Sequence, residues 1–159
     1  MPFYTVFGNC DKSGVSDYIS SKGISLHERE LKISDYTIGG FGGSNKSPFG
    51  TPSEYEEDHI MAGLSKLSYK NMVLVTHVPP YGTKLDRIGN NKSIGSNSVR
   101  TIIEKKQPLV AISGHVHESR AIDYLGKTAL LNPGPLKDGY YGIVKLNLNE
   151  VKVELKEID

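Results

Sequence analysis

The sequence has a single cysteine, almost no net charge and no long apolar run. One cysteine, Cys10, excludes an internal disulfide framework and fits a reducing compartment. A formal net charge of +1 gives no reason to expect a nucleic acid or a membrane surface as a partner. No window approaches the roughly 18 apolar residues of a membrane span, and the amino terminus, Met1-Pro2-Phe3-Tyr4, does not resemble a leader. We therefore expect a cytoplasmic protein.

Repeats, low-complexity tracts and linkers are also absent, so we expect one domain over residues 1–159. Continuous apolar runs predict buried strands, at residues 3–7, 72–76 and 109–113. Apolar residues at helical spacing predict helices, at about residues 15–23, 53–68 and 99–107. A capping box of Ser53 and Glu56 is expected to open the second helix.

Alternating patterns predict antiparallel strand pairs, at residues 31–34 with 36–38, 121–124 with 128–131, and 144–148 with 151–155. The last pair is expected to turn near Asn149-Glu150. Glycines at 39–43 are expected to interrupt regular structure. They lack the Lys-Ser/Thr of a phosphate loop, which favours a close backbone approach beside a site. Helices between strands early and antiparallel strands late indicate a layered α/β domain with mixed sheets.

Side chains with ligand chemistry follow the three continuous apolar runs. Asn9 follows the first run, His77 the second, and His115 and His117 the third. Ligands of open α/β sheets bind at the carboxyl ends of parallel strands. Imidazole suits zinc, manganese, iron and nickel, and an amide oxygen suits harder cations. On extended backbone, His115 and His117 would point to one side and address one metal ion or two adjacent ions.

These residues resemble the last three of five motifs of the calcineurin-like metallophosphoesterases. The matching stretches are Gly8-Asn9-Cys10-Asp11, His77 after its strand, and Gly114-His115-Val116-His117. Residues 132–136 resemble the stretch that follows in small archaeal and bacterial members, so the resemblance covers nearly the whole chain. It implies two mixed β-sheets packed as a sandwich and flanked by helices.

The resemblance also implies a function. Asn9, His77 and His115 would hold one divalent metal ion and His117 would help to hold a second, each being manganese, iron, zinc or nickel. A metal-bound hydroxide would then hydrolyse a phosphomonoester or phosphodiester. One asparagine and three histidines are electrostatically incomplete for two divalent ions, because such a centre needs a bridging carboxylate.

The sequence departs from the family in two places. Cys10 stands where many members carry a histidine that protonates the leaving group; a free thiol, with a pKa near ~8.5, is a poor acid. Cys10 is therefore expected to pack, and Asp11 to orient or cap the loop. The family's first two motifs, Asp-x-His and Gly-Asp, should precede Gly8, but only seven residues precede it in this sequence. We expect an amino-terminally truncated domain without its first β-α-β portion, whose strand at 3–7 offers an open edge for self-association.

Other functions compete with a phosphoesterase. The absent bridging aspartate favours a noncatalytic metal or phosphate-binding module of the same fold. A metallo-β-lactamase is set aside, because its His-x-His pair precedes Asp-His, whereas Glu118-Ser119-Arg120 follows here. Five further residues are candidate substrate contacts for which surface roles are favoured: Tyr81, Lys84, Arg87, Arg100 and Arg120. Tyr81, Lys84 and Arg87 lie in a long loop at 81–96. A loop of this length indicates a functional or mobile segment.

Overall fold

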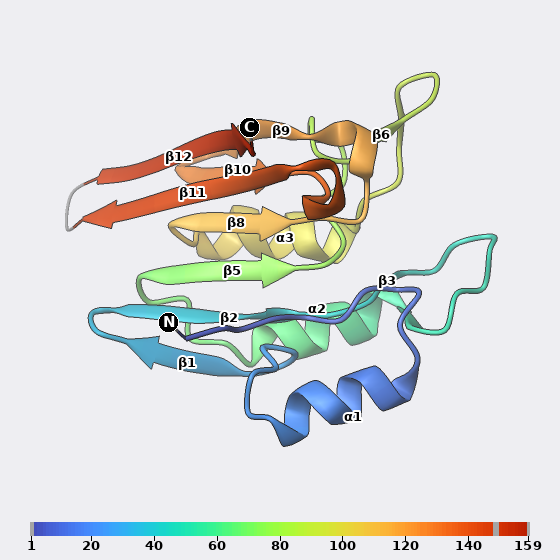
Figure 1. Cartoon of the computed structure of the whole chain (residues 1–159), viewed down its shortest axis with the longest axis horizontal. Helices are drawn as coiled ribbons and strands as arrows, with labels where there is room; N and C mark the ends of the chain where they lie inside the picture. The colour runs from blue at the N-terminus through green and yellow to red at the C-terminus, as the bar shows by residue number, and fades with distance from the viewer. Residues whose placement is uncertain (1, 148–149, 159) are drawn as a thin grey trace.

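The computed structural model describes residues 2–147 and 150–158. Its centre is a six-stranded mixed sheet (Figure 1). In spatial order the strands are β1 (Glu30–Ile33), β2 (Tyr36–Phe41), β5 (Met72–Thr76), β8 (Val110–Ser113), β10 (Thr128–Asn132) and β9 (Ala121–Leu125). The inner strands run parallel, from β2 through β5 and β8 to β10, and the two edge strands are antiparallel to their neighbours.

Helices cover one face of this sheet. Helices α2 (Glu57–Ser65) and α3 (Asn97–Lys106) contact each other and lie behind the sheet in Figure 1, whereas α1 (Ser13–Ser21) lies beside β1. Met72 and Leu74 of β5 pack against this helical layer in the main hydrophobic core. Burial of each such side chain contributes on the order of 2 kcal/mol. None of the helices in residues 2–147 and 150–158 is long and apolar enough to cross a membrane.

The carboxyl-terminal strands form a separate antiparallel pair. Strands β11 (Tyr140–Asn147) and β12 (Glu150–Glu157) lie on the face of the sheet opposite α2 and α3, and β12 contacts β9 and β10 (Figure 1). The expected turn falls partly on Leu148 and Asn149, which lie outside the described residues. The smaller elements are β3 (Ser44–Asn45), β4 (Glu54–Tyr55), β6 (Arg87–Ile88), β7 (Lys92–Ser93), and the short 3-10 helices η1 (His117–Ser119) and η2 (Leu136–Asp138).

The structure confirms the α/β fold class and adds detail to the expected sandwich. Among the described residues, the layer opposite the helices is the β11–β12 hairpin, which is antiparallel and not mixed. The three helices fall at the expected places, and the continuous runs at 72–76 and 109–113 form the parallel neighbours β5 and β8.

The strand expected at residues 3–7 is wrong. Only Thr5 pairs there, through one isolated bridge to Ser25. Its amide donates to the Ile24 carbonyl oxygen at 2.9 Å, and its carbonyl oxygen accepts from the Leu26 amide at 2.9 Å. Both bonds lie on the side of the segment that faces residues 24–26. Self-association itself stays a prediction.

Two local expectations also change. The glycines at 39–43 do not interrupt β2, which continues to Phe41. A Cβ on Gly40 would lie 1.7 Å from the Val75 carbonyl oxygen, which confirms the close backbone approach. The capping box is wrong, because helix α2 begins at Glu57 and the Ser53 hydroxyl instead donates to the Asp11 carbonyl oxygen at 2.6 Å. That hydroxyl serves the amino-terminal loop and is not available to a helix.

Candidate metal centre

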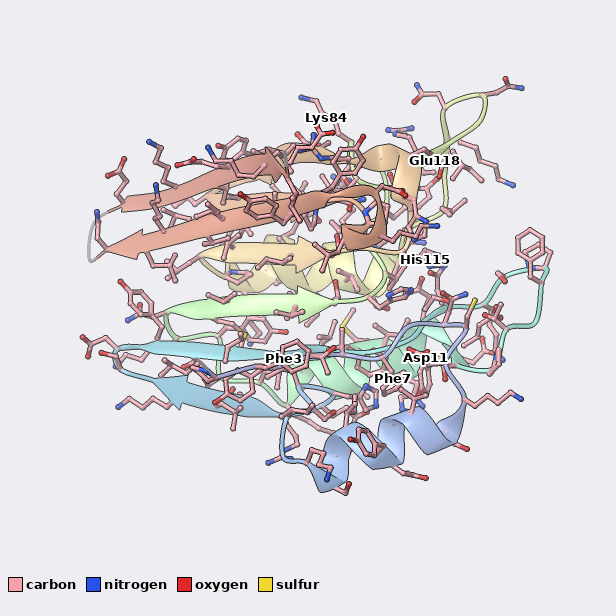
Figure 2. All side chains as sticks on the ribbon, in the orientation of Figure 1. Phe3, Phe7, Asp11, Lys84, His115 and Glu118 are labelled. Atoms are coloured by element: carbon pink, nitrogen blue, oxygen red, sulfur yellow. The ribbon has the colours of Figure 1, made fainter. Side chains whose placement is uncertain are left out.

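Two parallel strands deliver the two central histidines to one end of the sheet. Thr76 at the end of β5 lies opposite Ser113 at the end of β8, so the residues that follow leave the sheet together. The Gly114 amide donates to the His77 carbonyl oxygen at 3.0 Å, which keeps the two segments hydrogen-bonded beyond the ends of β5 and β8. Figure 2 shows His115 at the end toward which the arrows of β5 and β8 point. The carboxyl-terminal edge of the sheet is therefore the place where a site forms.

The amino-terminal loop brings Asn9 to the same edge. The Gly43 amide, just beyond β2, donates to the Phe7 carbonyl oxygen at 2.8 Å and fixes this loop to the sheet. Asp11 closes the loop, since its Oδ2 accepts from the Gly8 amide at 2.7 Å. A Cβ on Gly8 would lie 3.0 Å from Cε1 of His77, so this loop passes close against the ring.

Asn9, His77 and His115 meet as a triangle of donor atoms. Asn9 Oδ1 lies 3.0 Å from His77 Nε2 and 3.1 Å from His115 Nδ1. The two ring nitrogens are 3.2 Å apart, and such a contact requires that at least one of them carries no proton. Three lone-pair donors at these separations fit around one divalent ion with ligand distances of about 2.0–2.2 Å. The residues present therefore fit one metal ion.

Burial keeps both histidines in the form that binds metal. Burial and then the neighbouring charge of His115 lower the pKa of His77 to about 4, against an opposing effect of Asp11. Burial also lowers the pKa of His115, with a second contribution from His117 and an opposing one from Glu54. Neutral imidazole is the ligand form, so both rings are ready to bind at neutral pH.

Glu54 orients Asn9 through Thr51. Asn9 Nδ2 donates to Thr51 Oγ1 at 3.0 Å, and Thr51 donates to Glu54 Oε1 from its hydroxyl at 2.6 Å and from its amide at 2.9 Å. Ser47 adds two further bonds to the same carboxylate, from its amide and its hydroxyl. Hydrogen bonds from Ser47 and then Thr51 lower the pKa of Glu54 to about 2. With Nδ2 held in this way, Oδ1 of Asn9 faces the two rings.

Sequence reasoning missed Glu54. The signal was the Thr-x-x-Glu spacing of Thr51 and Glu54, which is the pattern of a capping box. We assigned that pattern to Ser53 and Glu56, two positions further along. At the earlier pair, the Glu54 carboxylate accepts from both the amide and the hydroxyl of Thr51, which organises a loop and not a helix.

The remaining predicted site residues lie around the triangle. His117 begins the 3-10 turn η1 and is exposed, and its charge reaches both other histidines. The extended backbone expected between the two residues of the His-x-His pair is wrong, because His115 has a left-handed φ of 66°. Cys10 is an exposed free thiol and does not have the packing role expected of it. Asp11 orients the loop through Gly8, and any catalytic role of either residue stays a prediction.

The five candidate substrate contacts have other partners or positions. Arg100 donates to the Tyr81 carbonyl oxygen at 2.8 Å, and Arg87 donates to the carbonyl oxygens of its own loop. Arg120 donates to two carbonyl oxygens and lies 4.5 Å from the Tyr140 ring centre. Lys84 is exposed in the long loop (Figure 2). The structure does not place these residues in the lining of the pocket beside the triangle.

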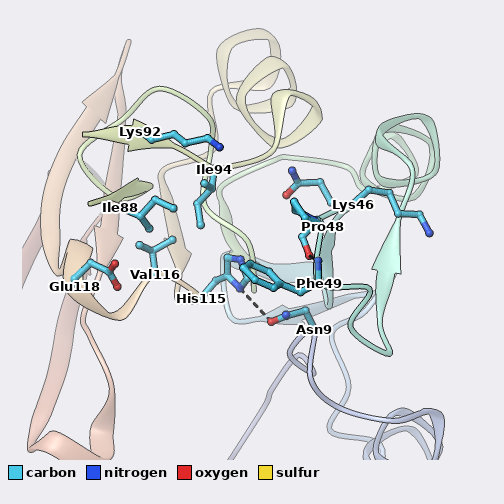
Figure 3. A pocket seen from close by; sticks show the side chains of 12 residues that line it. Asn9, Lys46, Pro48, Phe49, Ile88, Lys92, Ile94, His115, Val116 and Glu118 are labelled. Atoms are coloured by element: carbon cyan, nitrogen blue, oxygen red, sulfur yellow. Dashed lines mark hydrogen bonds between the residues drawn. The ribbon is translucent and has the colours of Figure 1, made fainter. Parts of the chain in front are cut away.

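That pocket has a volume of about 430 Å³ and opens above Asn9 and His115 (Figure 3). One wall comes from the segment that contains β6 and β7 together with Val116, and the other comes from the loop at 45–49. Glu118, next to His117, lines the pocket near Val116. A ligand bound at Asn9 and His115 would therefore extend into this pocket.

Carboxylates do not complete a larger centre in the part of the chain that the structure describes. No group of three or more His, Cys, Asp or Glu side chains in residues 2–147 and 150–158 is placed to hold a metal ion. Asp11 and Glu54, whose charges reach the two rings, bond to the Gly8 amide and to the Ser47 and Thr51 groups respectively. The described residues thus supply neutral donors for one ion. Of the four predicted metal ligands, only His117 lies outside the triangle.

Comparisons with known proteins agree with this fold. A family profile described as metallophosphoesterase, calcineurin superfamily, matches residues 32–158. The uncharacterized protein MJ1162 of Methanocaldococcus jannaschii is 41% identical over 141 residues, which are 85% of this chain and 65% of that protein. A protein of Caenorhabditis elegans, UPF0046 protein K07C11.7, is 36% identical over 67 residues, which are 42% of this chain and 22% of that protein.

Two solved structures share the fold. One crystal structure superposes with a TM-score of 0.73 at 25% identity and covers 98% of this chain and 65% of its own. The structure of TT1561 of Thermus thermophilus has a TM-score of 0.61 at 19% identity, covers 90% of this chain and 63% of its own, and supports the fold alone. The chain therefore spans just under two thirds of the length of MJ1162 and of these two structures.

Proposed function

Since the chain belongs to the metallophosphoesterases of the calcineurin superfamily, we propose that it hydrolyses phosphomonoesters or phosphodiesters with two bound divalent metal ions. The observation that carries the proposal is the triangle of Asn9, His77 and His115, whose donor atoms lie 3.0–3.2 Å apart. A structural role alone does not explain why two neutral rings and an amide oxygen converge at the end of a sheet beside a pocket.

Each residue has a proposed part. Asn9, His77 and His115 hold one ion, and His117, exposed at the start of η1, contributes to the second. Bound divalent ions polarise phosphoryl oxygens and make water a nucleophile at neutral pH. Glu54 and Thr51 keep the Asn9 oxygen turned toward the rings. Cys10 follows Asn9, and because a free thiol is a poor acid, the leaving group is one that departs without strong protonation or takes its proton from water.

The test is hydrolysis of bis-p-nitrophenyl phosphate with added Mn²⁺. We expect His77→Ala and His115→Ala to lower kcat/KM by at least about 100-fold, because ligand loss exceeds the 10- to 100-fold effects of residues that only orient ligands. His59→Ala serves as the matched control, since that ring is exposed on helix α2. Equal activity in His77→Ala and wild type would sink the proposal.

A second candidate is a noncatalytic metal or phosphate-binding module of the same fold. It is favoured by the lack of a carboxylate bridge among residues 2–147 and 150–158. Calorimetric titration with Mn²⁺ separates the two: one equivalent bound without turnover supports the module, whereas two equivalents with turnover support the hydrolase.

A further inference from the structure

The pocket beside the triangle has an apolar interior. Pro48 and Phe49 lie on one side, and Ile88, Ile94 and Val116 lie on the other (Figure 3). Its floor is polar, because Asn9 and His115 lie there. A volume of about 430 Å³ falls in the range in which small organic ligands bind. An inorganic phosphate ion would leave most of this space unused.

Phe49 is the most exposed large apolar side chain at this site. It is 87% exposed, although its backbone is held in place. The Phe49 amide donates to Ser47 Oγ at 3.2 Å, and Ser47 donates in turn to Glu54 at 2.6 Å. An ordered loop that presents an aromatic ring to solvent beside a pocket provides a surface on which a flat group can stack.

The same carboxylate supports both halves of the site. Glu54 holds Ser47, which precedes Phe49, and Thr51, which orients Asn9. The apolar wall and the polar floor are therefore built on one hydrogen-bonded unit, and their relative position is set by Glu54. A ligand with a phosphoryl end and an apolar end matches this arrangement.

One charged side chain on the wall of the pocket is placed to attract an anion. Lys92 comes from the wall opposite Lys46; Lys46 pairs with Glu56 at 3.9 Å, and Glu118 also lines the pocket. Lys92 is exposed, so it attracts an incoming anion and leaves the interior apolar.

We propose that this pocket binds the organic part of a phosphate ester that carries an aromatic or similarly flat apolar group. The phosphoryl group lies at Asn9 and His115, and the flat group lies between Phe49 and the side chains of Ile88 and Ile94. This assignment rests on the proposed phosphoesterase function and names its substrate class. Phe49 is the residue that determines specificity, and Lys92 assists capture of the anion.

Binding of two phosphonates, which are not hydrolysed, tests the assignment. Calorimetry of the full chain with Mn²⁺ compares benzylphosphonate with methylphosphonate. We expect benzylphosphonate to bind at least about tenfold more tightly, since a buried aromatic group adds both apolar area and ring stacking. Phe49→Ala should reduce this preference to below about threefold and leave the affinity for methylphosphonate within about twofold.

Tyr124→Ala is the matched control, because Tyr124 is a 62% exposed aromatic residue on β9 that does not line the pocket. It should keep the full preference. Equal binding of the two phosphonates by wild type, an undiminished preference in Phe49→Ala, or no binding of either phosphonate would each overturn the assignment. A preference that depends on Phe49, found without turnover of aryl phosphates, would overturn the hydrolase and leave the binding pocket standing.

Discussion

His115 combines a ligand position with an unfavourable backbone conformation. Its φ of 66° lies in the left-handed region, which costs residues with a Cβ roughly 1–2 kcal/mol and costs glycine almost nothing. The fold tolerates this conformation at the turn between β8 and η1, where the ring is directed toward Asn9. Backbone strain at a functional residue is a common way to fix the direction of a side chain.

Removal of that strain should be measurable. We expect His115→Gly to be more stable than His115→Ala by about 1 kcal/mol, because both variants lack the ring and only glycine relaxes the backbone. Urea unfolding without added metal measures the difference. At Lys152, an exposed position in β12, the order should reverse, since glycine in a regular strand costs conformational entropy. A less stable His115→Gly would contradict a strained conformation.

At the scale of elements, the first residue of α2 caps the start of α3. Glu57, the first residue of α2, accepts hydrogen bonds from the Asn97 amide at 3.1 Å and the Ser98 amide at 2.8 Å, in the first turn of α3. It also accepts from the Ser96 hydroxyl at 2.7 Å, whose oxygen accepts from the Val99 amide. One carboxylate therefore satisfies the free amides of the neighbouring helix and fixes the two helix starts together.

We expect Glu57→Gln to lower the free energy of unfolding by about 1–2 kcal/mol, because it removes a charged acceptor from a helix amino terminus. Asp58→Asn is the control. That residue is also acidic in the first turn of α2, and we expect its loss to cost about 0.5 kcal/mol. Urea unfolding compares the two variants, and equal losses would show that the contact between the helices contributes nothing.

Sequence patterns predicted the elements whose hydrogen bonds follow from periodicity. The continuous run at 72–76 and the alternation in the tail became β5, β11 and β12. Residues 3–7 carry an equally apolar pattern, but Thr5 bonds to the backbone at residues 24 and 26 and Phe7 bonds to Gly43, so no regular ladder forms. The meeting of His77 and His115 was predictable because each follows one of two parallel neighbouring strands, whereas Asn9 follows no regular strand. The wall with Phe49 was not, because its position depends on Glu54 across a loop.

Across the whole molecule, buried neutral histidines link stability to pH. Burial is the largest cause that lowers the pKa of both His27 and His77, and His27 Nδ1 accepts from the Gly42 amide at 3.0 Å, which requires an unprotonated nitrogen. Because these folded-state pKa values lie below the ordinary histidine value of 6.5, the unfolded chain takes up protons first as the pH falls. Stability is full above about pH 6.5 and is lost as the pH falls toward the folded pKa.

For His77, with a folded pKa of about 4, the expected loss between pH 7.5 and pH 5 is on the order of 2 kcal/mol. Urea unfolding at the two pH values measures it, and His77→Ala should lose less stability than wild type over the same interval. Wild type that is equally stable at both values would show that these rings titrate normally in the folded protein.

The triangle joins parts of the chain that are far apart in sequence. Asn9 lies 68 positions from His77 and 106 positions from His115. These donors meet only when β5 and β8 are paired and the amino-terminal loop is fixed beyond β2. An ion that needs all three donors therefore binds the folded chain and not the unfolded one, and at 100 times its dissociation constant it adds about 2.7 kcal/mol of stability. The supply of a divalent cation would then help to set how much of the protein is folded.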